Sequence, residues 1–153
     1  MSGRRMHAVW LALATAAAVY LCVLESPAYG QPSRPQLRVA VGTISSPALR
    51  SALEDELATL GGVRLANESR ARYVVTGTFT RLERRRVGTT ALEVDCEVSL
   101  ILADARGGAI RMMLSGRAGA RGGAAGDAVE RAAVEAAVRG ALRPLPRTLR
   151  RMR

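Results

Sequence analysis

The sequence contains no lysine, and its single histidine, His7, lies near the N-terminus. The rest of the chain therefore lacks the commonest general base and the residue that forms Schiff bases. It also has no phosphate-binding glycine loop, no nucleophile-elbow motif and no metal-ligand spacing of histidine and cysteine. We expect a protein that is not an enzyme, with no catalytic residue, cofactor or metal site. A hydrolase that uses carboxylates alone is the remaining enzymatic hypothesis.

Cysteine and aromatic residues are also scarce. Beyond residue 30 only Cys96 remains, so this part of the chain cannot form an internal disulfide. Cys96 alternates with apolar residues, which favours a small buried hydrophobe over a nucleophile. Aromatic residues are 3% of the chain, too few for the stacking platforms typical of single-strand nucleic-acid binding. We expect an aliphatic core and no nucleic-acid partner.

Positive charge is abundant by contrast. The chain of 153 residues carries a formal charge of +10, and all 23 basic residues are arginine. Such a surface attracts anionic lipids and acidic polymers. The length favours a single folded domain.

Residues 1–30 have the features of a secretory signal peptide. Arg4 and Arg5 precede an uncharged apolar run from Ala8 to Leu24, and small residues then lead to a cleavage site between Gly30 and Gln31. The alternative is a retained membrane anchor, although the run is shorter than the roughly 20 residues of a membrane-spanning helix. The bulky residues before Cys22 argue against a lipid-attachment site. We expect an exported protein, periplasmic or associated with the envelope.

Residues 31–36 contain two prolines and are predicted to be a linker. A strand is predicted for residues 37–44, because apolar residues alternate with small or polar ones. Ser46 and Pro47 are typical of a helix start. Leucines recur at helical spacing up to residue 60, and the Gly61-Gly62 pair predicts the helix end. Val63–Leu65 is a candidate short edge strand.

Residues 73–115 are predicted to be three antiparallel strands joined by two glycine-containing turns. The clearest strand is 93–103, where Val94, Cys96 and Val98 alternate with Glu93, Asp95 and Glu97. A glycine- and alanine-rich run, predicted to be flexible, separates the third strand from a helix that begins near Asp127 and ends before Pro144. Overall we predict an α+β domain over residues 37–142. Its order is strand, helix, three-strand meander, helix, in a single mostly antiparallel sheet of about four strands covered by two helices.

The acidic row of Glu93, Asp95 and Glu97 has two interpretations. One is a cation site, but residues at this spacing spread over about 13 Å, too far to converge on one ion. The favoured interpretation is cross-strand pairing with arginines of the preceding strand. The candidates for that pairing are Arg81, Arg84, Arg85 and Arg86.

Residues 143–153 form an arginine-rich tail without acids. If it is helical, its apolar residues lie on one side and its arginines on the other. The apolar side could dock on the sheet, or the tail could lie on an anionic membrane. The apolar residues are Leu142, directly before the tail, and Leu145, Leu149 and Met152 within it. The arginines assigned to membrane contact are Arg143, Arg147, Arg150 and Arg151.

The segment Tyr73–Thr80 (YVVTGTFT), followed by the strand that ends Leu102-Ala103-Asp104 and by Gly107-Gly108, resembles a pattern in bacterial envelope proteins. These are domains of the curli-secretion-channel subunit and penicillin-binding-protein-activator lipoprotein type. The resemblance covers roughly residues 37–142 and implies a periplasmic α+β domain used for protein–protein contact. We expect a non-enzymatic envelope domain that binds an envelope protein. The alternative is a basic module that binds anionic lipid or polysaccharide.

Overall fold

The computed structural model describes residues 36–123 and 126–151. Residues 34–153 make one compact unit. The predicted signal peptide, its cleavage site and the linker up to residue 35 lie outside the described residues, as does Met152 of the tail.

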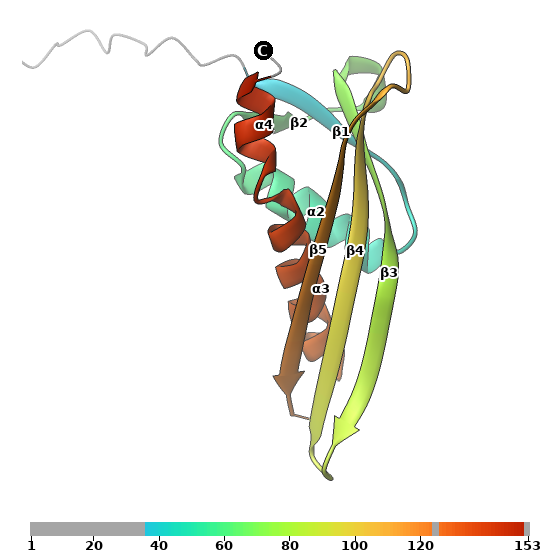
Figure 1. The fold of residues 1–153 in the computed structure, drawn as a ribbon, viewed down its shortest axis with the longest axis vertical. Coiled ribbons are helices and arrows are strands. Elements are labelled where there is room, and N and C mark those ends of the chain that lie inside the picture. Colours follow the sequence, from blue (N-terminus) through green and yellow to red (C-terminus); the bar gives the residue numbers. More distant parts are fainter. Residues whose placement is uncertain (1–35, 124–125, 152–153) are drawn as a thin grey trace, which may run out of the picture. The chain divides into compact units, whose positions relative to one another are not determined.

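The described chain forms a single sheet with helices packed on it (Figure 1). The strand order across the sheet is β2-β1-β3-β4-β5. In chain order the elements are β1 (Leu37–Ile44), α2 (Pro47–Thr59), β2 (Val63–Leu65), the short 3-10 helix η1 (Glu68–Arg70), β3 (Tyr73–Val87), β4 (Ala91–Asp104), β5 (Ile110–Gly122), α3 (Gly126–Leu142) and α4 (Leu145–Arg151).

The α+β class is confirmed, but the predicted sheet needs correction. It has five strands, and β1 pairs in parallel with both β2 and β3, whereas β3, β4 and β5 form the predicted antiparallel meander. The physical reason is the crossover through α2, which returns the chain to the starting end of the sheet, so that β2 runs in the direction of β1. The connection through η1 then carries the chain past β1 to its other side.

The two predicted turns of the meander are present, and each contains a glycine with positive φ. Gly88 has φ 68° and Gly108 has φ 65°, values that an L side chain adopts only with strain. The strands are longer than the pattern indicated. In particular β5 continues to Gly122, through the run predicted to be flexible, because Ala118 and Ala120 pack against the core.

Helices α2 and α3 cover the same face of the sheet (Figure 1). The predicted leucine stripe of α2 is buried there: Leu49, Leu53 and Leu57 are fully inaccessible. From α3, Val134 and Val138 enter the same core. Each such side chain contributes about 1.5–3 kcal/mol by leaving water, and none of the buried residues described is polar or charged.

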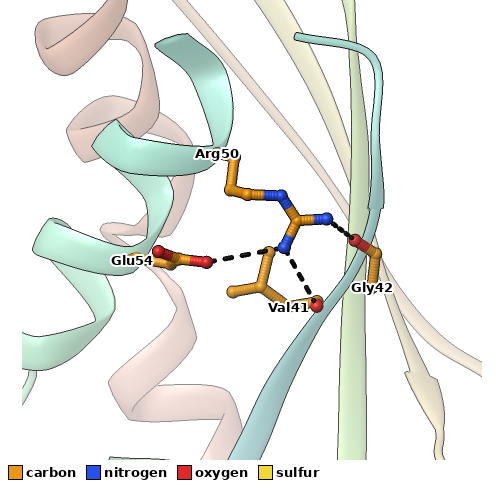
Figure 2. Close-up of polar contacts among 4 residues, drawn as sticks. All are labelled: Val41, Gly42, Arg50 and Glu54. Atoms are coloured by element: carbon orange, nitrogen blue, oxygen red, sulfur yellow. Dashed lines mark hydrogen bonds and ion pairs between the residues drawn. The ribbon is translucent and has the colours of Figure 1, made fainter. Parts of the chain in front are cut away.

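Helix α2 begins as predicted, since the Ser46 hydroxyl accepts a hydrogen bond from the Ala48 N–H at 3.2 Å. A second polar contact fixes this helix on β1 (Figure 2). The Arg50 guanidinium donates to the Gly42 carbonyl at 2.6 Å and reaches the Val41 carbonyl and the Glu54 carboxylate at 3.5 Å. Arg50 therefore supplies donors to two carbonyls at the end of β1, where the pairing of β1 with β3 is irregular.

The tail continues as helix α4, and its leucines belong to the core. Leu145 is fully buried and Leu149 is 5% exposed, while Arg147, Arg150 and Arg151 are exposed. The two predicted alternatives were docking of these leucines on the protein and contact of the tail with a membrane. The structure shows Leu145 and Leu149 docked on the protein.

Candidate functional site

The face of the sheet opposite α2 and α3 carries side chains that these two helices leave uncovered; we call it the open face. Alternation along β4 separates the two sides. Val94, Cys96 and Val98 are buried on the helix side, whereas Glu93 and Asp95 are only half-buried on the open face. Strand register extends this division to β3 and β5, since directly paired residues lie on the same side of a sheet.

One end of the open face is mainly apolar, with Thr76 as a hydroxyl residue among aliphatic ones. Two rows of paired residues cross it from β3 through β4 to β5. Met113 is 68% exposed and Ile110 is 62% exposed, although both are large apolar residues. The rows are Thr76, Ile101 and Met113, and Val74, Ala103 and Ile110; we call these six residues the apolar end. Apolar patches of this kind, next to polar residues, are typical of interaction sites.

The other end of the open face is charged, and a row of hydroxyl residues separates it from the apolar end. That row is Thr78, Ser99 and Ser115. Beyond it, Glu97 lies between Arg81 and Arg117, and Glu93 lies between Arg85 and Arg121. The resulting charged end consists of Arg81, Glu83, Arg85, Glu93, Asp95, Glu97, Arg117 and Arg121.

The predicted cross-strand pairing holds for one arginine. Arg85 lies 3.4 Å from Glu93 and 3.8 Å from Asp95. Arg81 instead pairs with Glu83 of its own strand at 2.7 Å, and this hydrogen bond lowers the pKa of the Glu83 carboxyl.

The prediction is wrong for Arg84 and Arg86, which stand opposite the apolar Val94 and Leu92. Arg84 and Arg86 therefore point to the same side of the sheet as Val94, which is the side that the helices cover. Arg84 accordingly forms an ion pair with Glu130 of α3, not with the acidic row.

Cys96 lies in the core, as its alternation with apolar residues predicts. Its side chain is 1% exposed. Burial, with a smaller effect from the negative charge of Glu130, raises the pKa of the thiol to about 11. The thiol is therefore protonated at neutral pH and is a poor nucleophile.

A groove of about 660 Å³ lies between α2 and α3. Asp55, Asp127 and Glu135 line it together with the Arg84–Glu130 pair. Within residues 36–123 and 126–151, no group of three or more acidic, histidine or cysteine side chains is arranged to hold a metal ion. The groove presents carboxylates and arginines without a histidine, lysine or accessible cysteine.

Arg143, Arg147 and Arg151, predicted from the tail, line a groove of about 560 Å³ together with Gly140 and residues of the tail. Arg150 is exposed but does not line this groove. Sequence reasoning identified these arginines but missed the apolar end. The sequence of β5 indicated only part of it: Met113 and Leu114 are consecutive and must therefore lie on opposite faces.

No protein-family model and no curated protein sequence matches the chain. Solved structures resemble it in fold. A minor lipoprotein from Acinetobacter baumannii has a TM-score of 0.54 at 17% identity, over 77% of this chain and 93% of that one. Lipoprotein B from Nitrosomonas europaea has a TM-score of 0.53 at 18% identity, over 72% and 83%. The PelC dodecamer from Paraburkholderia phytofirmans has a TM-score of 0.51 at 20% identity, over 72% and 89%.

These similarities show that the chain has a fold used by bacterial lipoproteins. The resemblance inferred from the sequence holds at this coarser level and not for the finer assignment, because the three structures are not of the curli-secretion-channel or penicillin-binding-protein-activator type. No helix in the described part of the chain combines the length and hydropathy of a membrane span.

Proposed function

We propose that the chain is an exported, non-enzymatic envelope domain that works by binding another envelope protein through the open face of its sheet. The observation that carries this proposal is the exposure of Met113 and Ile110 on a face that α2 and α3 leave uncovered. Burying large apolar side chains of this kind is a main source of free energy in protein association. The lipoprotein fold and the signal-peptide features of residues 1–30 support an envelope location.

The pattern of the open face favours a second copy of the chain as the partner. Consider two copies face to face, related by a two-fold axis that runs along the strands between β4 and β5. This axis places β4 of one copy opposite β5 of the other and keeps each row in register. Glu97 then faces Arg117, Glu93 faces Arg121, and Ile101 faces Met113. This one arrangement therefore brings opposite charges together and brings apolar residues together.

Self-association is also known for a protein with this fold, since PelC from Paraburkholderia phytofirmans forms a dodecamer. In the face-to-face arrangement, the apolar end supplies the affinity. The charged end selects the relative orientation. If one copy were shifted sideways by one strand, β4 would face β4 or β5 would face β5, and like charges would meet.

The test is the molar mass of the chain beginning at Gln31, measured by light scattering over a range of concentrations. The cluster of buried residues lies wholly between Leu37 and Leu149, so this chain retains its core. We expect self-association that Met113→Asp abolishes. The control is Ala58→Asp, which adds the same charge at an exposed position of α2.

A wild-type chain that stays monomeric at every concentration would exclude a second copy as the partner. Association that both variants preserve equally would show that the open face is not the contact surface. Because the apolar end supplies the affinity, we expect the association to survive physiological salt.

A further inference from the structure

The turn after α3 and the outer side of α4 form a strongly basic groove. Arg143, Arg147 and Arg151 line it, together with Gly140, Pro144 and Thr148. The lining contains three guanidinium groups and no carboxylate. The groove is thus unlike the one between α2 and α3, whose lining holds four acids and two arginines.

These arginines also differ from others nearby in having no acidic partner in the described part of the chain. Arg139, one turn earlier on α3, pairs with Glu56 at 2.7 Å, and Arg84 pairs with Glu130. No ion pair joins Arg143, Arg147 or Arg151 to an acid among residues 36–123 and 126–151. Like charges this close repel one another, and an anion placed among them relieves the repulsion.

The burial of Leu145 and Leu149 limits how α4 can contact a membrane. An amphipathic helix normally binds a bilayer by inserting its apolar side below the headgroups. Here that side is already in the protein core, while the arginines face solvent. Contact through α4 is therefore restricted to the headgroup level and to charge.

We propose that the groove of Arg143, Arg147 and Arg151 binds the phosphate groups of anionic phospholipid headgroups. The planar guanidinium donates two parallel hydrogen bonds to phosphate oxygens, which makes arginine well suited to this group. Three such side chains on one short segment can hold neighbouring phosphates in a lipid surface. Arg150, exposed beside the groove, adds to the attraction.

The experiment measures co-sedimentation of the chain beginning at Gln31 with vesicles of phosphatidylglycerol and phosphatidylcholine, and with vesicles of phosphatidylcholine alone. Two triple variants carry the same change in net charge. The groove variant is Arg143→Gln, Arg147→Gln and Arg151→Gln; the control variant is Arg64→Gln, Arg86→Gln and Arg106→Gln, three exposed arginines without an ion pair in the described residues.

We expect the wild-type chain to bind only the vesicles that contain phosphatidylglycerol, with an affinity that falls steeply as salt rises. Each basic residue near such a surface contributes a factor of about five, so the groove variant should bind on the order of 100-fold more weakly. The control variant should stay much closer to wild type. Met113→Asp, which tests the proposed function, should leave vesicle binding intact, so the two proposals can fail separately.

Three results would overturn this inference. The first is unchanged binding by the groove variant, and the second is an equal loss in the control variant, which would reduce the effect to net charge. The third is binding of glycerol phosphate in solution as tight as vesicle binding, which would assign the groove to a free phosphate ligand instead of a membrane.

Discussion

Gly116 of β5 lies directly against Ala137 of α3: a Cβ atom on Gly116 would stand 2.0 Å from the Ala137 carbonyl oxygen and 2.6 Å from the Ala141 nitrogen. Both neighbours are backbone atoms of a helix and cannot turn aside. The missing side chain therefore sets how closely α3 packs on the sheet.

Gly116→Ala should accordingly destabilise the fold by about 2–3 kcal/mol or more, because α3 must move away from β5. The control is Gly119→Ala on the same strand, where the nearest atom is an Asp95 carboxylate oxygen at 3.2 Å, at the end of a side chain that can shift. We expect a change within about 0.5 kcal/mol there. Urea unfolding of the two variants measures both effects, and equal midpoints would contradict the close-packing argument.

Arg50 should contribute to stability mainly through the Gly42 carbonyl. Arg50→Met keeps the length of the side chain but removes the donor at 2.6 Å. Since the site is only partly buried, we expect a loss of about 1 kcal/mol. Glu54→Gln changes only the contact at 3.5 Å and should cost less than about 0.5 kcal/mol. Chemical denaturation distinguishes the two, and a larger loss for Glu54→Gln would reverse the assignment.

The tail should behave as part of the folded domain. Leu145→Ala removes a fully buried side chain and should lower the free energy of unfolding by about 2–4 kcal/mol. Arg150→Ala, an exposed neighbour on the same helix, should change it by less than about 0.5 kcal/mol. Thermal unfolding followed by circular dichroism reports both. A Leu145→Ala variant as stable as wild type would mean that α4 is not docked in solution.

Cys96 should be unreactive in the folded chain. With its thiol buried and its pKa raised to about 11, little thiolate forms at mildly alkaline pH. In the chain beginning at Gln31, where Cys96 is the single cysteine, a thiol-specific reagent such as Ellman's reagent should label the native protein slowly and the denatured protein at once. Rapid, complete labelling under native conditions would contradict the burial of the Cys96 thiol.

Asp104 should titrate at lower pH than a free aspartate. Its carboxylate accepts from the Arg111 side chain at 2.9 and 2.5 Å, and this hydrogen bonding lowers the pKa of the Asp104 carboxyl below its usual value of 3.8. The stabilisation is present above the unfolded pKa of about 3.9, and it is lost as the pH falls through the lower folded value.

Carboxyl NMR titration measures the Asp104 pKa directly. Arg111→Gln should raise the pKa of Asp104 toward 3.8, whereas Arg106→Gln, in the adjoining turn, should leave it in place. If neither substitution moved the Asp104 titration, the hydrogen bond would not be its cause.

Local patterns predicted the elements well, and the pairings less so. The cap at Ser46, the leucine stripe of α2 and the alternation around Cys96 each depend on residues close together in the chain, and all three are present. The parallel pairing of β1 with β2 and β3 depends on where the chain crosses the sheet, which no local pattern encodes.

The same distinction explains the candidate sites. The tail arginines were visible as a run of one charge. The apolar end required the register of three strands, since Thr76, Ile101 and Met113 are adjacent only once those strands pair. Arg84 and Arg86 were misassigned because consecutive residues of a strand point to opposite sides. A β-bulge between Phe79 and Arg81 then decides that Arg85 shares the side of the acidic row.

The two outer strands of the sheet are very unequal. On one side β2 has three residues, and on the other β5 has thirteen, with no further strand beside it in the described part of the chain. Only the β5 edge is long enough to template a strand from another molecule. If β5 of one copy paired with β5 of a second copy, growth of the sheet would stop there. The joined pair would present only its two short β2 strands at the outer edges. The unequal length of the two outer strands therefore prevents the sheet from extending copy by copy into a fibre.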